Sequence, residues 1–405
     1  MEATMRPTRP GQGFARARGA RSLIALAGGI ALLATGCGEG GGTGGADDPI
    51  VIASLEPMTG GNVLKNYIDG TRMAVEEVNA AGGIMGRKVV LKEYDTAIDP
   101  AKSAQAARLA VADKVDAAIG LPSSIEFKAA AKILQRADIP FMSMGVSTAT
   151  SLNEEGGHPN TYRVMTRMEK LIYAGSMFVV QDVKPKTVGL MGLKIDYGIT
   201  AMPRFERHLK GAGVTTLPPK LYPYDVKDLT AEVLSMRPAD AIVDWSYPNQ
   251  MAVGVRQSFQ NGIKVPYLGG PATSILDTRK LVPPEAMEKV YGVQLCNPPA
   301  DERQYVRDWA QRYQKKYGDV ADYGAAGVYD AIFMLKAAME QAQSTKPDAV
   351  GKALGTINHT KGMCALAYKS DADHEMMNEA VIVSFAGGQQ KSVRKFGAGD
   401  LAGKG

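Results

Sequence analysis

Cysteine and histidine are scarce in this chain of 405 residues, and their scarcity limits its metal and redox chemistry. The chain has three cysteines and four histidines, namely Cys37, Cys296, Cys364, His158, His208, His359 and His374. None of them lies in a CxxC pair or in a Cys/His cluster with the spacing of zinc ligands. We therefore expect no metal site and no bound cofactor.

The signatures of common enzyme classes are missing as well. The sequence has no GxGxxG followed at a distance by an acid, no phosphate-binding P-loop, no GxSxG elbow and no zinc-protease motif. The paired carboxylates Glu76 and Glu77 fall in a segment of helical periodicity, where a solvated helix face explains them more simply than catalysis does. We predict that the protein is not an enzyme.

The chain has little excess of either charge outside its first 36 residues. The net charge is +5, but residues 1–36 hold five arginines and one glutamate (+4), so the remainder carries 5 − 4 = +1. A nearly neutral body gives no electrostatic basis for binding nucleic acid. We expect no nucleic-acid partner.

A long apolar run occurs only near the start. Residues 22–34 read SLIALAGGIALLA behind an arginine-rich stretch, which is the layout of a secretory signal peptide and too short for a permanent span. The run ends in LLATGC, which resembles a bacterial lipobox with Cys37 as the acylated first residue, although Leu is commoner than Ala at the position of Ala34. The alternative is a plain signal peptide and a free Cys37. We predict a lipoprotein signal peptide over 1–36 and a flexible Gly-rich tether over 37–49.

Apolar strand-like and helix-like segments alternate along the body. Strands are predicted at 50–57, 87–95, 115–120 and 139–145, with helices between them at 71–83, 100–114 and 123–138. The rhythm restarts after residue 162, with strands at 186–192, 239–246 and 265–270 and helices at 171–181, 198–213, 229–236 and 250–262. This pattern predicts an α/β fold of two halves, each with a parallel sheet covered by helices.

Eight stretches, in order along the body, carry a family resemblance. They include LEPMTG (55–60), GTRMAVEEVNAAGGIMGRKVVL (70–91), VDAAIGLPSS (115–124), ADIPFMSMGVST (137–148), DYGITA (196–201), ADAIVDWSYP (239–248), GIKVPYLGG (262–270) and YGAAGVYDAIFMLKAAME (323–340). The chain resembles the type I periplasmic solute-binding proteins, in the branched-chain amino-acid (Leu/Ile/Val) family of ABC importers. The AVEEVNAAGGIMGRK block is the most specific part.

That resemblance implies two Rossmann-like lobes joined by three hinge crossovers. We place the crossovers near Tyr162–Thr166, Val293–Pro298 and Ile357–Met363. Lobe one then comprises 50–163 plus 298–357, and lobe two comprises 164–297 plus 358–397. Cys296 and Cys364 both fall beside crossovers, where they are either bridged, as an exported protein permits, or two separate thiols.

Ligands of open α/β sheets bind beyond the carboxyl ends of the strands. In lobe one, Ser123 and Ser124 begin a helix, where hydroxyls and free N–H groups favour a carboxylate, unless one serine is only an N-cap. The resemblance implies that Gly145 and Ser147 hold the ligand's head group. Asn62 lies in a loop where relatives usually carry an aromatic residue.

Three aromatic residues are predicted to form the lid from lobe two. Tyr197 in DYG matches a tyrosine that closes over the ligand in relatives. Trp245 and Tyr247 follow the ADAIVD strand. Aromatic rings exclude water and add apolar contact area, while the alternative for each of them is ordinary core packing.

One departure from the family concerns charge. Amino-acid binders usually have an acid after the LGG-like strand to pair with the ligand's ammonium, but this chain reads LGGPATS there. An ammonium buried without a counter-charge costs several kcal/mol. Either Asp244 or Asp196 substitutes for the acid, or the ligand has no ammonium and is a carboxylate or amide, with an aromatic group favoured by Trp245.

These features together predict an extracytoplasmic solute-binding lipoprotein of an ABC importer. It would trap a small amino acid or carboxylate by closure of two lobes, as a monomer, and deliver it to permease subunits. We expect it on the outer face of the bacterial cytoplasmic membrane, anchored by lipid, or in the periplasm. The alternative is a ligand-sensing lipoprotein of the same fold that signals to a membrane receptor.

Overall fold

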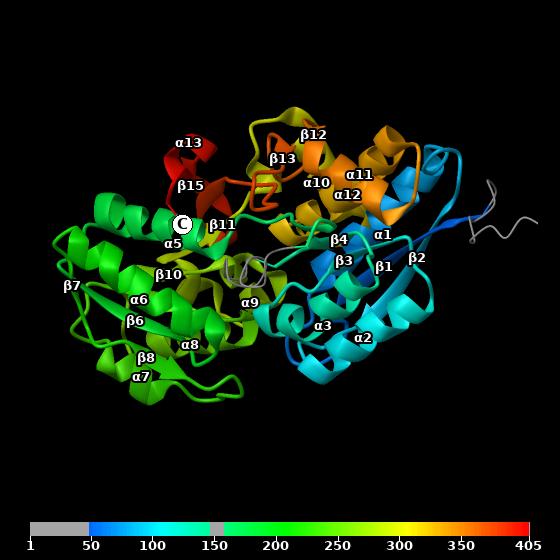
Figure 1. Cartoon of the computed structure of the whole chain (residues 1–405). Helices are drawn as coiled ribbons and strands as arrows, with labels where there is room; N and C mark the ends of the chain where they lie inside the picture. Colours follow the sequence, from blue (N-terminus) through cyan, green and yellow to red (C-terminus); the bar gives the residue numbers. More distant parts are fainter. Residues whose placement is uncertain (1–47, 146–157, 405) are drawn as a thin grey trace, which may run out of the picture. The chain divides into compact units, whose positions relative to one another are not determined.

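The structure is a computed structural model, and it describes residues 48–145 and 158–404. Residues 45–405 form one compact unit that contains every element discussed below. Two large sheets organise this unit (Figure 1). No helix within the described ranges is long and apolar enough to cross a membrane. The predicted signal peptide and Cys37 lie outside the described residues.

The first sheet has five parallel strands. In spatial order they are β2 (Val89–Asp95), β1 (Ile50–Glu56), β3 (Ala117–Gly120), β4 (Phe141–Ser143) and β5 (Thr161–Arg163). Its helices are α1 (Lys65–Ala80), α2 (Pro100–Ala112), α3 (Ser124–Arg136), α10 (Gln304–Tyr317), α11 (Tyr323–Ala342) and α12 (Pro347–Thr356). The strand and helix alternation predicted for this half is confirmed.

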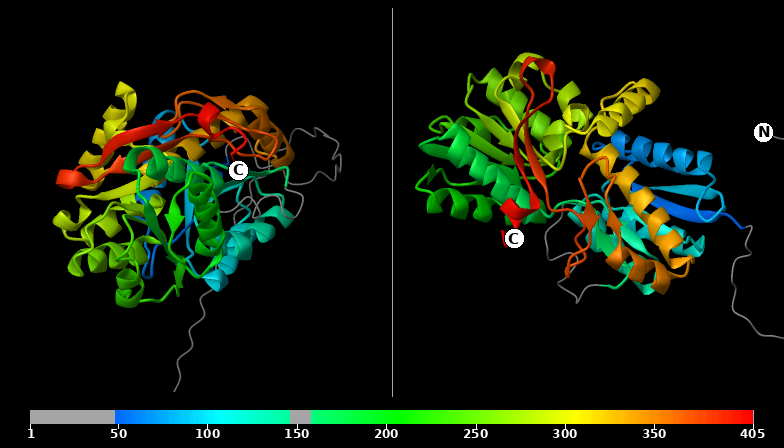
Figure 2. Two further views of the ribbon diagram at one scale, coloured as in Figure 1. Left: turned by 90° about the vertical axis from the view of Figure 1, so that its left-hand side faces the viewer. Right: turned by 90° about the horizontal axis from the view of Figure 1, so that it is seen from above.

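Side-chain alternation along β1 decides which helices cover which face. Ile50 and Ile52 join a core shared with α1 and α11, whereas Ala53 and Leu55 join a core shared with α2 and α3. Because successive side chains of a strand point to opposite faces, the sheet is covered on both sides. Figure 2 shows α11 beside α1, although the two are far apart in sequence.

The second sheet is mostly parallel and has an antiparallel edge. Its order is β15 (Lys391–Phe396), β14 (Ala380–Ser384), β11 (Val290–Gln294), β10 (Tyr267–Gly269), β9 (Ala241–Trp245), β6 (Thr187–Leu193) and β7 (Thr215–Thr216), with β8 (Lys220–Tyr222) also paired to β6. Its helices are α5 (Met168–Phe178), α6 (Asp196–Gly211), α7 (Thr230–Ser235), α8 (Pro248–Gln260), α9 (Leu276–Lys280) and α13 (Ala398–Leu401).

Short irregular elements complete the chain. A π-helical turn, η1 (Val179–Val183), extends α5, and 3₁₀ turns occur at η2 (Pro271–Ser274), η3 (Pro284–Met287), η4 (Pro298–Ala300) and η5 (Ala386–Gly388). Two short antiparallel strands, β12 (Asn358–His359) and β13 (Tyr368–Lys369), pair with each other apart from both large sheets. The α/β class with parallel sheets predicted from the sequence is confirmed.

The third passage between the sheets comes later than the predicted Ile357–Met363. Asp330 of α11 accepts hydrogen bonds from the backbone N–H groups of Met363 (2.8 Å) and Cys364 (2.9 Å) and from the Tyr368 hydroxyl (2.8 Å). This buried carboxylate holds the segment against α11 of the first half. The chain then pairs with the second sheet at β14, so the crossover follows β13.

Candidate functional site

The site is built at the carboxyl end of the first sheet, where β3 turns into α3. Gly120 has φ of +120°, and a Cβ there would lie 2.2 Å from the Leu55 carbonyl oxygen, so glycine is required. Leu121 follows in the left-handed region with φ of 54° while its N–H donates to Leu55. This sharp turn brings Ser123 to the start of α3.

Ser123 and Ser124 have different roles at that helix start. The Ser123 Oγ accepts from the Glu126 N–H at 3.4 Å, and the Glu126 carboxylate accepts from the Ser123 N–H at 2.9 Å, which is a capping box. The Ser124 hydroxyl is 2% exposed and has no hydrogen-bond partner among the described residues. Ser123 therefore stabilises the helix, and Ser124 offers an unused polar group.

Glu126 is fully buried beneath this turn. Burial raises its pKa to about 7, even though hydrogen bonds from Ser123 and Thr96 favour the charged form. The carboxyl group caps α3 from inside the protein and does not line the pocket described below.

The second half contributes tyrosines from two helix starts. Tyr197 lies in the first turn of α6, and Tyr247 is the residue before α8. Their ring centroids are 5.4 Å apart, and the Tyr247 hydroxyl approaches Ser123. Burial raises the pKa of both tyrosines, so both keep their protons at neutral pH.

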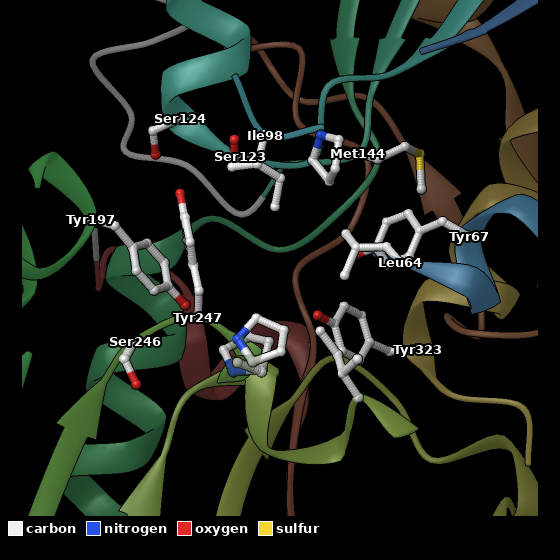
Figure 3. Close-up of a pocket in the computed structure, with 15 residues that line it drawn as sticks. Leu64, Tyr67, Ile98, Ser123, Ser124, Met144, Tyr197, Ser246, Tyr247 and Tyr323 are labelled. Carbon is white, nitrogen blue, oxygen red and sulfur yellow. The ribbon is translucent and has the colours of Figure 1, made fainter. Parts of the chain in front are cut away.

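These residues surround a pocket between the two halves (Figure 3). It encloses about 530 Å³ of empty space, counting its opening to solvent. Its lining consists of Leu64, Tyr67, Ile98, Pro122, Ser123, Ser124, Met144, Tyr197, Ser246, Tyr247, Pro248, Pro271, Ala272, Ile275 and Tyr323. None of these described lining residues carries a charge.

Four of the eight predicted ligand-binding residues line this pocket. Ser123, Ser124, Tyr197 and Tyr247 are brought together. Trp245 is fully buried behind Tyr197, with 5.7 Å between ring centroids, and packs in the core against Phe205. The alternative of core packing therefore holds for Trp245.

Gly145 and Ser147 were expected to hold the ligand's head group. Gly145 is buried, and its N–H donates to the Ser143 hydroxyl at 3.4 Å, while its neighbour Met144 lines the pocket. Ser147 lies outside the described residues.

Asn62 makes contacts between the halves instead of lining the pocket. Its side-chain amide donates to the Tyr224 hydroxyl at 2.9 Å, and its carbonyl oxygen accepts from the Asn249 N–H at 3.1 Å. The Asn249 side chain also donates to the Gly61 carbonyl. Loop 59–64 is thus attached to the start of α8, and Tyr224 in turn packs edge-on against Tyr247.

Neither acid considered as a substitute counter-charge faces the pocket. The two oxygens of Asp244 accept from the hydroxyls of Tyr222 and Tyr267, each at 2.6 Å, and burial raises the pKa of this acid to about 6. Asp196 forms an ion pair with Lys128 across the opening between α6 and α3. Both carboxylates therefore already have protein partners.

Comparison with known proteins agrees with this geometry. The family model described as periplasmic binding protein matches residues 49–390. The chain belongs to this family. A Leu/Ile/Val-binding protein homologue of Brucella melitensis is 26% identical over 345 residues, covering 79% of this chain and 83% of the relative.

Solved structures resemble this periplasmic binding protein over most of its length. The leucine-binding protein LivK of Thermotoga maritima superposes with a TM-score of 0.80 at 22% identity, over 87% of this chain and 99% of its own. An ABC-transporter solute-binding protein of Rhodopseudomonas palustris was solved with 3,4-dihydroxybenzoic acid. It superposes with a TM-score of 0.77 at 19% identity, over 87% of this chain and 98% of its own. The type I fold predicted from the sequence is confirmed, and so is the prediction of a binding protein without enzymatic activity.

The periplasmic binding protein contains a disulfide between Cys296 and Cys364, with 5.2 Å between Cα atoms. The bridge joins the end of β11 to the segment held on α11. Arg303 supports the same segment by donating to the carbonyl oxygens of Gly362 (2.9 Å) and Ala365 (2.8 Å).

Several pocket residues of the binding protein were not singled out from the sequence. Tyr67 and Tyr323 begin α1 and α11 and form an edge-to-face pair with centroids 6.2 Å apart. Tyr323 opens a stretch that resembles the family, and Tyr67 lies just before another. Their positions near helix starts that follow strand ends could have indicated a place in the site. Pro122, Pro248 and Pro271 stand in quoted stretches but were not singled out either.

Proposed function

We propose that this binding protein is the substrate-binding component of an ABC importer and that it traps a small carboxylate lacking an ammonium group. The observation that carries the proposal is the pocket itself, which combines an unpartnered buried serine at a helix start with walls free of charged side chains among the described residues.

The carboxylate end is assigned to the start of α3. Helix N-termini carry free N–H groups and the positive end of the helix dipole, which favour anions. The Ser124 hydroxyl adds a donor that nothing in the described protein uses, and Tyr247 adds a second hydroxyl on the opposite wall. A carboxylate placed between them would satisfy groups that otherwise remain buried without partners.

We propose a ligand without an ammonium group because the nearby acids already have protein partners. Asp244 and Asp196 were the two acids considered as counter-charges for an ammonium. Asp244 accepts hydrogen bonds from two tyrosines, and Asp196 forms an ion pair with Lys128. An ammonium in the neutral pocket would lose its hydration without gaining a counter-charge, at a cost of several kcal/mol.

The rest of the pocket suits a flat apolar body. Prolines 122, 248 and 271 and the rings of Tyr197 and Tyr247 supply rigid surfaces. Among the relatives, one is named for leucine and another holds 3,4-dihydroxybenzoate, so the fold accommodates both amino acids and aromatic acids. We favour an aromatic acid because its neutral ring and single carboxylate match this pocket.

A thermal-shift screen of the chain from residue 46 onward tests this proposal. The panel contains branched-chain amino acids, aromatic acids, short carboxylates and amides. A ligand that binds only the folded state raises the melting temperature by mass action. We expect shifts with carboxylates that lack an amine, whereas shifts confined to leucine, isoleucine or valine would contradict the proposal.

We further propose that the mature protein is anchored by lipid at Cys37 and presents its ligand to permease subunits in the membrane. The lipobox-like LLATGC and the Gly-rich tether support this. Expression in a bacterium with a labelled fatty acid should label the wild type and leave Cys37→Ala unlabelled. Equal labelling of both proteins would contradict the anchor.

A further inference from the structure

The pocket has a second polar end that the carboxylate site does not use. Tyr67 and Tyr323 form it, from the first turns of α1 and α11. Figure 3 shows this pair on the side of the pocket opposite Ser124 and Tyr197, with the Tyr323 hydroxyl directed inward. The apolar side chains of Leu64 and Met144 lie beside them.

A buried acid lies behind this pair. Glu56 is the last residue of β1 and shares the strand face of Ile50 and Ile52, which α1 and α11 cover. It is fully buried, and neither carboxyl oxygen has a hydrogen-bond partner among the described residues. Buried polar atoms without hydrogen-bond partners are costly. Glu56 therefore adds unpartnered polar atoms behind this end of the pocket.

The charges around the pair favour a neutral occupant. Burial, and then Glu126, raises the pKa of Glu56 well above its ordinary value, so the surroundings of this acid favour its neutral form. Asp322 caps α11 by accepting from the Ala325 N–H at 3.0 Å, and the positive charge of Arg279 faces it. A cation would thus meet Glu56, whose charged form is disfavoured by its surroundings, and the positive charge of Arg279 near Asp322.

The two tyrosines remain hydrogen-bond donors. Burial raises the pKa of both, and for Tyr67 the neighbouring Tyr323 contributes next, so neither hydroxyl ionises near neutral pH. A hydroxyl can donate one hydrogen bond and accept another. A ligand hydroxyl placed here could accept from one tyrosine and donate onward to the other or to water.

We infer that Tyr67 and Tyr323 form a subsite for a hydroxyl group at the end of the ligand remote from its carboxylate. The inference rests on the proposed function, because it assumes a carboxylate at Ser124. It narrows the ligand class from aromatic acids in general to hydroxylated aromatic acids, with the ring between the two polar ends.

Isothermal titration of benzoate and 4-hydroxybenzoate against wild type, Tyr67→Phe and Tyr323→Phe tests the subsite. We expect wild type to bind the hydroxy acid about tenfold more tightly than benzoate, because one well-placed hydrogen bond is worth about that much. Each variant should lose most of this preference and bind benzoate within about twofold of wild type. Tyr291→Phe, on β11 and outside the pocket lining, is the matched control and should keep the preference.

The two claims fail in different ways. Equal binding of both acids by wild type, or a preference unchanged in both pocket variants, would overturn the hydroxyl subsite while leaving the carboxylate proposal standing. No binding of either acid would overturn the subsite and the preference for an aromatic acid, whereas the carboxylate proposal would still be judged by the short carboxylates of the thermal-shift screen. Tighter binding of 4-(aminomethyl)benzoate than of 4-hydroxybenzoate would show a cation site that ionises Glu56 and would also overturn the inference.

Discussion

Substitutions of the adjacent residues Ser123 and Ser124 should affect different properties, namely the stability of the fold and the affinity for the ligand. Ser124 has a buried hydroxyl without a protein partner, so Ser124→Ala should hardly change the free energy of unfolding. It should weaken carboxylate binding about tenfold or more, since a hydrogen bond to a charged group contributes roughly 1.5–3 kcal/mol. Titration calorimetry and urea unfolding measure the two effects.

Ser123→Ala is the matched control for that variant. It removes the capping box with Glu126 and should cost about 1 kcal/mol of stability. If Ser124→Ala instead destabilised the fold as much and left affinity unchanged, Ser124 would be a structural residue and the carboxylate site would lie elsewhere.

Buried acids make the stability depend on pH. The pKa of Glu126 is raised from 4.5 to about 7, so between these values the folded protein binds a proton that the unfolded chain releases. The stabilising contribution is complete below about pH 4.5 and is lost as the pH rises through about 7. Melting temperatures should therefore fall over this window.

The variant Glu126→Gln measures how much of the pH-dependent decrease in melting temperature is due to Glu126. The amide keeps a capping oxygen but does not titrate, so the decrease should be smaller by about 2 °C or more. Asp244, with a pKa raised to about 6, would still contribute part of the slope. An identical slope in the variant would show that Glu126 is not the titrating group.

Four of the eight residues predicted to bind the ligand line the pocket. Ser123, Ser124, Tyr197 and Tyr247 could be found because helix starts after strands predict the edge of a sheet. Trp245 was wrong as a lining residue because alternation along a short strand does not tell which side faces a cleft and which faces a core. Tyr67 and Tyr323 were missed because their pairing depends on helices distant in sequence.

Among the elements, loop 59–64 and the start of α8 are joined through Asn62. Asn62→Ala removes hydrogen bonds to Tyr224 and Asn249 without touching a residue that lines the pocket. If these bonds exist only when the halves are closed, their loss should raise the ligand's dissociation rate and weaken affinity about fivefold, at about 1 kcal/mol. Stopped-flow binding measures the two rate constants.

Tyr224→Phe removes one of the same bonds from the other side. Its effect should not add to that of Asn62→Ala in the double variant, because both remove a shared contact. Fully additive effects, or a change in the association rate alone, would contradict a role in holding the halves together.

Helices and strands were easier to predict from the sequence than the crossovers of the chain between the two sheets. The strands and helices of both halves that lie before residue 270 follow largely from local periodicity and from glycine and proline positions. The third crossover was placed too early because its location depends on Asp330, whose carboxylate binds the segment of Met363, Cys364 and Tyr368. Such a tertiary contact has no local sequence signal.

For the molecule as a whole, the disulfide between Cys296 and Cys364 closes a loop of sequence separation 68. Replacing both cysteines by serine should lower the free energy of unfolding by about 2–4 kcal/mol, because the unfolded chain regains the entropy of that loop. Denaturant unfolding of the double variant measures this. Wild-type protein treated with reductant should behave the same way, and a stability unchanged by either treatment would contradict a structural bridge.

The central claim concerns the whole pocket: it binds a carboxylate and excludes an ammonium. Two ligand pairs differ only by the α-amino group, namely 4-methylpentanoate with L-leucine and 3-phenylpropanoate with L-phenylalanine. Because the described lining offers no counter-charge, each amino acid should bind at least about 100-fold more weakly than its partner, as calorimetry would show. Equal or tighter binding of either amino acid would mean that an acid reaches the ligand after all, and it would contradict the account.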